Sequence, residues 1–142
     1  ENSYGLIGND ANPIHPGKRM LWSMTPTFLE SDKGFVILGT PGGSRIISMI
    51  LLSALDWING GDAKSMVSIP RFHHQYHPDY VLYEEKAFSQ IEINNLEEMG
   101  HKLKKSNRQF GNMQVIQWSR KKNEINVASD PRGREKELTD VY

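Results

Sequence analysis

The sequence contains no cysteine among its 142 residues. Disulfide bonds are therefore excluded, and cysteine usage gives no information about the redox compartment. An excess of charge is also missing, because 17 lysine and arginine residues balance 17 aspartate and glutamate residues. A neutral chain offers no electrostatic reason to bind nucleic acid or an anionic membrane surface.

Long apolar runs are missing as well. The most apolar stretch, residues 46–58, is shorter than the ~20 residues that a membrane-spanning helix needs. We therefore expect neither a signal peptide nor a membrane span in these residues. The apolar share of 37% is low for a self-sufficient globular domain. The chain opens with Glu1 rather than Met, and its length fits a single domain, or a piece of one, over residues 1–142.

The pattern with the most chemical content is a glycine-rich turn at residues 39–45. Residues 35–38 predict a short buried strand before it. Residues 46–58 predict a helix that is apolar on nearly every side and is therefore expected to be buried on nearly every side. Such a turn leaves the backbone N–H groups of Gly42, Gly43 and Ser44 free to face an anion or a developing oxyanion. The simpler alternative, in which the glycines only permit a sharp turn, is favoured on these residues alone. A nucleotide-phosphate loop is disfavoured, because G-x-x-x-x-G-K-[ST] is absent.

The remaining pattern mixes strands and helices. Residues 1–17 have loop composition. We predict two hairpins, one of residues 25–29 and 35–38 and one of residues 113–118 and 124–128. We predict two further helices, one at 63–67 capped by Asp62 and one from Ser89 through Met99. Single strands are predicted at 80–84 and, more weakly, at 102–104. Residues 69–78, which lie between two prolines, are expected to be irregular. Trp57 is expected in the core.

Three histidines, His73, His74 and His77, could suggest a metal site. However, adjacent histidines on extended backbone point in opposite directions, and no carboxylate lies at a familiar ligand spacing. We therefore predict that they hold no metal.

Two serines, Ser23 and Ser44, could be nucleophiles. Neither Ser23 nor Ser44 lies in a G-x-S-x-G elbow. Ser44 is more simply a helix cap, and Ser23 a hydroxyl at a strand edge. The segment Asp130-Pro131-Arg132 predicts a turn, with a salt bridge or an anchor as the alternatives.

Several stretches together resemble the small subunit of γ-glutamyltranspeptidases. They follow that family's order and cover nearly all of the chain: Y-G-L-I-G-N-D-A-N at 4–12, P-G-K-R at 16–19, L-W-S-M-T-P-T at 21–27, G-T-P-G-G-S-R-I-I at 39–47, P-R-F-H-H-Q at 70–75 and A-S-D-P-R at 128–132. The resemblance implies an α+β fold, namely part of the αββα sandwich of N-terminal-nucleophile hydrolases, built from two subunits cut from one precursor.

The reaction implied by this resemblance is transfer of a γ-glutamyl group from glutathione or a related amide to an amino acid, a peptide or water. An N-terminal threonine attacks the γ-amide carbonyl, with its own α-amine as the base, and a second nucleophile releases the acyl-enzyme. No cofactor or metal is implied. By position, Gly42 and Gly43 would form the oxyanion hole, so the functional interpretation of the turn now outweighs the simpler one.

The resemblance also implies a substrate contact at Trp22 and Ser23, where the family has two adjacent serines that bind the α-carboxylate of the glutamyl group. Ser23 matches this pattern. Trp22 does not, because an indole with a single N–H replaces a hydroxyl and could narrow the pocket.

A second departure concerns the nucleophile. The family's threonine starts the small subunit well before the position of Tyr4, and it is not among these residues. We therefore expect a C-terminal part of the small subunit that is inactive alone, with the rest of that subunit and the large subunit as partners. The resemblance suggests a periplasmic, secreted or cell-surface location. Two alternatives stay open: a sister acylase acting on β-lactam side chains or poly-γ-glutamate, which Trp22 would fit, and a non-catalytic scaffold.

Overall fold

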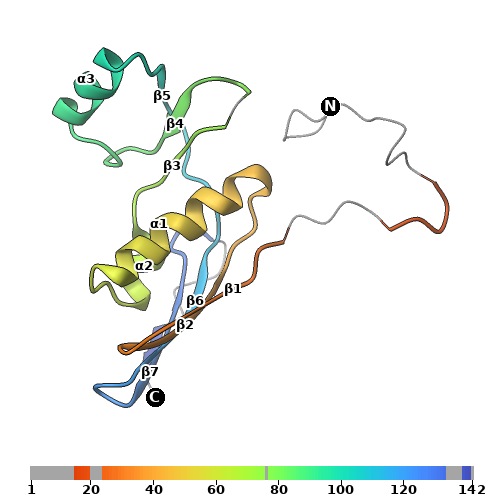
Figure 1. The fold of residues 1–142 in the computed structure, drawn as a ribbon, viewed down its shortest axis with the longest axis vertical. Coiled ribbons are helices and arrows are strands. Elements are labelled where there is room, and N and C mark those ends of the chain that lie inside the picture. Colours follow the sequence, from red (N-terminus) through yellow and green to blue (C-terminus); the bar gives the residue numbers. More distant parts are fainter. Residues whose placement is uncertain (1–14, 20–23, 76, 134–138, 142) are drawn as a thin grey trace.

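The computed structural model describes residues 15–19, 24–75, 77–133 and 139–141. A five-stranded sheet and a three-stranded sheet form its framework (Figure 1). The elements in chain order are β1 (Thr27–Ser31), β2 (Gly34–Gly39), the 3-10 turn η1 (Gly43–Arg45), α1 (Ile46–Ile58), α2 (Ala63–Ser68), β3 (Phe72–His73), β4 (Val81–Tyr83), α3 (Gln90–Glu98), β5 (Leu103–Lys105), β6 (Gln114–Ser119), β7 (Glu124–Ser129) and β8 (Thr139–Val141).

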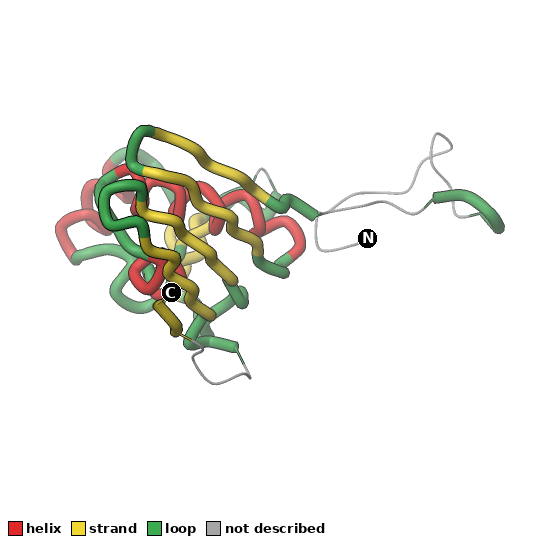
Figure 2. Tube along the Cα trace, turned by 90° about the horizontal axis from the view of Figure 1, so that it is seen from below, coloured by secondary structure: helices red, strands yellow, loops and turns green. Residues whose placement is uncertain are grey.

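The larger sheet has the strand order β1-β2-β6-β7-β8, and every neighbouring pair is antiparallel. The hairpins β1–β2 and β6–β7 confirm the two predicted ones. Figure 2 shows these strands as one layer with the helices packed behind it. The smaller sheet, β3-β4-β5, lies with α3 beyond one end of this layer (Figure 1).

The core lies between the larger sheet and α1 with α2. Alternate residues of β2 and β6, including Val36, Leu38 and Val115, are at most 2% exposed. They pack against Met49 and Met66 from the two helices. Burial of these side chains is the main force that holds the helices on the sheet.

The opposite side of the sheet is apolar and uncovered among the described residues. Phe28 is 73% exposed, and Ile116, Ile125 and Phe35 also belong to the exposed large apolar side chains. Phe28 lies across from Ile37, which in turn lies across from Ile116, so these residues form a row on one face. A sheet with apolar residues on both faces is typical of an inner layer.

Helix α1 has the predicted bounds but not the predicted burial. Its buried side chains lie on one face, and Trp57 is among them, as expected. The other face carries Ile47, Leu51, Leu55 and Ile58, which are 45–71% exposed. The prediction of burial on nearly every side is therefore wrong for the described part of the chain, because the sheet and α2 cover only one side of the helix.

Helix caps were predictable in two cases out of three. Asp62 caps α2 and Ser89 caps α3, each in a reciprocal capping box with the third helical residue. Ser44 does not cap α1, since the turn η1 intervenes and the N-cap is Arg45 without a side-chain bond. No helix within the described ranges is long and apolar enough to cross a bilayer.

Candidate active site at the Gly42–Gly43 turn

The predicted glycine turn joins the end of β2 to the start of α1. Gly42 and Gly43 have φ values of 153° and 60°, a region that side chains with a Cβ rarely adopt. Their carbonyl groups accept the N–H groups of Arg45 and Ile46. Their own N–H groups have no acceptor among the described residues. Two backbone donors therefore remain available at the N-terminal end of a helix.

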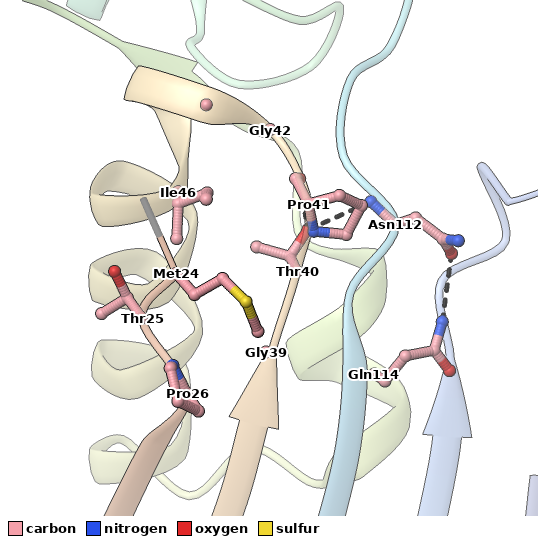
Figure 3. A pocket seen from close by; sticks show the side chains of 11 residues that line it. Met24, Thr25, Pro26, Gly39, Thr40, Pro41, Gly42, Ile46, Asn112 and Gln114 are labelled. Carbon is pink, nitrogen blue, oxygen red and sulfur yellow. Dashed lines mark hydrogen bonds between the residues drawn. The ribbon is translucent and has the colours of Figure 1, made fainter. Parts of the chain in front are cut away.

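A cavity of about 620 Å³ opens beside these donors (Figure 3). Its wall comes from the segment before β1, the turn after β2, the first residue of α1 and the start of β6. It is lined by Met24, Thr25, Pro26, Gly39, Thr40, Pro41, Gly42, Gly43, Ile46, Asn112 and Gln114. A mostly apolar wall with a few polar groups is typical of a pocket for a small organic substrate.

The polar wall of this pocket is a chain of hydrogen bonds that fixes the turn to β6. The backbone N–H of Asn112 donates to Thr40 Oγ1 at 3.1 Å. Gln114 Nε2 donates to Asn112 Oδ1 at 3.1 Å, as Figure 3 shows. Ser129 Oγ in turn donates to Gln114 Oε1 at 2.7 Å. These bonds hold the wall beside the two glycines in one position.

Met49 fills the space behind the turn. It is fully buried, and a Cβ placed on Gly42 would lie 2.5 Å from its methyl carbon. A Cβ on Gly111 would lie 2.5 Å from its sulfur and would also meet the guanidinium of Arg71. Close packing and a positive φ therefore both favour glycine at these two positions.

Behind Met49 lies a buried network of four charged side chains: Arg71, Glu84, Asp130 and Arg132. The guanidinium of Arg71 donates to the Asp130 carboxylate at 2.5 Å. The guanidinium of Arg132 donates to Asp130 at 3.1 Å and to Glu84 at 2.8 Å. Two cations thus meet two anions, which is the condition under which buried charges are tolerated.

The network also fixes the backbone that leads into the pocket. Glu84 accepts the N–H groups of Arg71 at 3.1 Å and Phe110 at 2.9 Å. Arg71 donates to the carbonyl of Phe110. Because Phe110 comes two residues before Asn112, the network holds the start of the polar wall in place.

The pKa of Asp130 lies below its ordinary value. Burial acts to raise it, but the N–H groups of Met113 and Arg132 and the guanidinium of Arg71 stabilise the carboxylate and outweigh burial. The pKa of Arg71 is lowered by burial and by Arg132, against the opposing effect of Asp130. Asp130 is thus held as an anion in the core.

The predicted site residues divide into two groups. Gly42 and Gly43 border the pocket. Trp22 and Ser23 lie outside the described residues, although they directly precede Met24, which lines the pocket.

The histidines of the P-R-F-H-H-Q segment do not converge. His73 is buried between Ser48 Oγ at 2.8 Å and Gln75 Oε1 at 2.9 Å. His74 is exposed and pairs with Asp79 at 3.1 Å. The described residues contain no group of three or more side chains arranged to hold a metal ion. The absence of a metal from these histidines stays a prediction.

Sequence reasoning missed the buried network. The turn predicted at residues 130–132 is present, and the backbone N–H of Gly133 donates to the backbone carbonyl of Asp130. However, the side chains of Asp130 and Arg132 both point into the core. The partners of Arg71 lie 13 and 59 residues away along the chain. No local pattern could have joined them.

Several known proteins are similar to this chain. The family described as gamma-glutamyltranspeptidase matches residues 1–139. The glutathione hydrolase proenzyme of Escherichia coli K12 is 42% identical over 92% of this chain and 22% of its own length. That of Pseudomonas sp. A14 is 45% identical over 72% of this chain and 18% of its own length. The chain thus spans about a fifth of the length of each of these two curated relatives.

A solved structure gives the same assignment. The γ-glutamyltranspeptidase T380A mutant of Helicobacter pylori matches with a TM-score of 0.80 and 34% identity, over 93% of this chain and 73% of that one. This likeness confirms the predicted fold, an α+β chain that forms part of the αββα sandwich of N-terminal-nucleophile hydrolases. With a family match over nearly all of its residues, the chain belongs to the γ-glutamyltranspeptidase family.

Proposed function

We propose that this chain supplies the oxyanion hole and part of the donor pocket of an enzyme that transfers or hydrolyses γ-glutamyl groups. The substrates are glutathione and related γ-glutamyl amides, and the acceptor is an amino acid, a peptide or water. The observation that carries the proposal is the pair of unpartnered N–H groups at Gly42 and Gly43, beside a pocket of substrate size.

The chemistry that suits these donors is acyl transfer. A threonine hydroxyl attacks the γ-carbonyl carbon, the α-amine of that threonine takes the proton, and the carbonyl oxygen becomes an oxyanion. Donors aimed at this oxygen stabilise the transition state more than the ground state. Collapse of the oxyanion expels the amine, which takes up the proton, and leaves an ester. A second amine or water then attacks the ester in the same way. The threonine comes from a part of the protein outside these residues.

The pocket beside the turn suits the glutamyl chain. Its apolar wall, with Met24, Pro26 and Ile46, suits the methylenes of the glutamyl side chain. Ser23, next to Met24 in the sequence, is proposed to donate to the α-carboxylate, with Trp22 beside it. Replacement of the family's hydroxyl by the indole of Trp22 favours a second candidate, a sister acylase with an altered acyl group.

The partners proposed for this chain are the remaining parts of the same precursor. The apolar sheet face with Phe28 and Ile116, and the α1 stripe with Ile47 and Leu51, are uncovered among the described residues. Two uncovered apolar faces on opposite sides of one α and one β layer support burial against further layers.

The proposal is tested on the full-length, matured protein. Hydrolysis of a chromogenic γ-glutamyl anilide and of glutathione should be detectable, and the chain of residues 1–142 alone should show none, because it lacks the nucleophile. A full-length protein that cleaves neither substrate, but cleaves other acyl amides, would replace the proposal by the sister acylase. Turnover by residues 1–142 alone, with contaminants excluded, would show that the nucleophile is wrongly assigned.

A further inference from the structure

A second cavity, of about 320 Å³, borders the glycine turn on the side of β3 and β4. It is lined by Gly42, Ser44, Arg45, His73, Gln75, Pro78, Tyr80 and Leu82. Gly42 belongs to the walls of both cavities. The Gly42–Gly43 turn therefore lies between two cavities. The proposed function uses only the larger one.

The second cavity carries an unpaired cation. The guanidinium of Arg45 stacks on the ring of Phe110 at 4.8 Å, and the described residues provide it with no ion pair or hydrogen bond. Phe110 is buried and its N–H is fixed by Glu84, so the ring is a rigid support. None of the lining residues is acidic. The carboxylate next in sequence, Asp79, is exposed and paired with His74.

The other polar groups of the wall are mostly satisfied. Both ring nitrogens of His73 have partners, Ser48 and Gln75. The Gln75 amide nitrogen donates to the carbonyl of His77 at 2.6 Å. The hydroxyl of Tyr80 has no partner among the described residues, and the ammonium of Lys104 lies 5.1 Å from its ring centre.

The groups left for a ligand are thus the guanidinium of Arg45 and the hydroxyl of Tyr80. A guanidinium offers only donors, in a planar fork that matches a carboxylate. A cavity lined by a guanidinium, a hydroxyl and no acidic residue suits a carboxylate ligand.

We infer that this second cavity binds the carboxylate of the amino acid or peptide on the nitrogen side of the γ-glutamyl amide. The inference rests on the proposed function and adds a subsite to it. An amide carbonyl has its acyl chain on one side and its nitrogen substituent on the other. If the oxygen faces Gly42 and Gly43 and the glutamyl chain lies in the first pocket, the nitrogen substituent extends past the turn toward Arg45. The leaving amine and the accepting amine share this path.

The test compares free carboxylates with neutral amides in the full-length, matured protein. On the leaving side, a γ-glutamyl dipeptide is compared with the same dipeptide amidated at its C-terminus. On the accepting side, glycylglycine is compared with glycylglycine amide. The wild type should prefer the carboxylate by about 10- to 100-fold in kcat/KM, as expected for a hydrogen bond to a charged group. Arg45→Met, which keeps the apolar stem, should reduce this preference to near unity in both arms.

Further variants separate recognition from a structural effect. Arg45→Lys should keep part of the preference, and Tyr80→Phe should lower it several-fold. Arg108→Met, at an exposed arginine that lines neither cavity, should retain it. If Arg45→Met does not mature, Tyr80→Phe decides in its place.

The results distinguish this inference from the proposed function. An equal fall in kcat/KM for carboxylate and amide substrates in Arg45→Met would overturn the subsite and leave Arg45 as a support of the turn. A wild type without any preference for the carboxylate would also overturn it, while γ-glutamyl transfer itself would stand. A loss of preference in only one arm would restrict the subsite to the leaving or to the accepting amine.

Discussion

The methyl carbon of Met49 occupies the space that a side chain at Gly42 would need, since a Cβ there would lie 2.5 Å away. The Gly42–Gly43 turn is therefore supported from behind by the first turns of α1. The position of the two donors depends on how this helix packs as well as on the conformation of the turn.

The first prediction concerns the two donors. Gly43→Ala places a Cβ at a φ of 60°, and Gly42→Ala adds a contact with Met49 to an unfavourable φ. Either change should rotate or crowd the amides and lower kcat by about 10²–10³, as loss of one oxyanion donor does. KM should change less, because the oxyanion exists only after the attack. The measurement is kcat and KM for a γ-glutamyl anilide with correctly cleaved protein.

The matched control for both variants is Gly100→Ala. This glycine also has a positive φ, of 91°, but a Cβ there meets nothing within 4 Å, and it lies after α3, away from the pocket. The Gly100→Ala protein should retain the wild-type kcat. A near-normal kcat in Gly43→Ala and Gly42→Ala would mean that the glycines are only turn formers.

The second prediction concerns Met49. Met49→Ala should lower the free energy of unfolding by about 2–5 kcal/mol, because it leaves a cavity in a fully packed core. The same space should accommodate the added methyl of Gly42→Ala. The double variant should therefore be less unstable than the sum of the single variants, with a coupling of about 0.5–3 kcal/mol. Denaturant unfolding of the wild type, the two single variants and the double variant gives the four free energies of this double-mutant cycle. If the losses of the two single variants add up to that of the double variant, the contact between Met49 and position 42 is not supported.

The third prediction concerns pH. Because the folded pKa of Asp130 lies below the ordinary value of about 3.9, its ionisation stabilises the fold fully above the unfolded pKa. This stabilisation should fall away as the pH drops through the folded pKa. Asp130→Asn should lower the free energy of unfolding by about 3–5 kcal/mol near neutral pH, because it leaves Arg71 unpaired in the core. It should also flatten the acid limb of the stability curve.

Chemical denaturation of the wild type and Asp130→Asn at a series of pH values below 5 tests both statements. Asp79→Asn is a useful comparison, because the pKa of Asp79 is likewise lowered, chiefly by its bond to His74, but on an exposed side chain. Exposed pairs contribute little. An acid limb that is unchanged in Asp130→Asn would assign acid sensitivity to other groups.

The fourth prediction concerns Trp22. If the indole excludes a second hydroxyl contact, Trp22→Ser in the full-length protein should tighten binding of γ-glutamyl substrates by roughly 0.5–3 kcal/mol. The readout is KM for the γ-glutamyl anilide. An unchanged or higher KM would indicate that the indole N–H already serves the α-carboxylate.

The fifth prediction is that His73, His74 and His77 hold no metal. His73 and His74 are engaged with different partners, and the proposed reaction needs no metal ion. Dialysed, untagged protein should contain less than stoichiometric zinc in elemental analysis. One zinc per chain, lost in a His73→Ala variant, would contradict this.

Local structure was largely predictable from the sequence. The bounds of α1, the caps Asp62 and Ser89 and both hairpins follow from apolar spacing and turn chemistry, which act over a few residues. The two-residue strand β3 and the three-residue strand β8 were missed, because each depends on a partner strand rather than on its own residues. Ser44 was misassigned as a cap because it lies inside η1, and the N-cap of α1 is Arg45.

The candidate site was predictable only in part. Gly42 and Gly43 are adjacent in sequence, so their turn could be found from composition and the resemblance. Their environment could not, because Asn112, Met49 and Arg45 approach the turn from separate elements. Which apolar residues of α1 stay exposed was equally out of reach, because burial depends on the layers that surround the helix.

The network of Arg71, Glu84, Asp130 and Arg132 restricts how this sequence can change over generations. Its formal charges sum to zero, so any single neutral replacement leaves one odd charge in the interior. Complete replacement by apolar residues of similar volume can be neutral for stability, but each path to it passes through such an odd-charge intermediate. A substitution at one of the four positions is therefore destabilising unless a second position changes with it. We expect the four residues to covary among relatives of this protein.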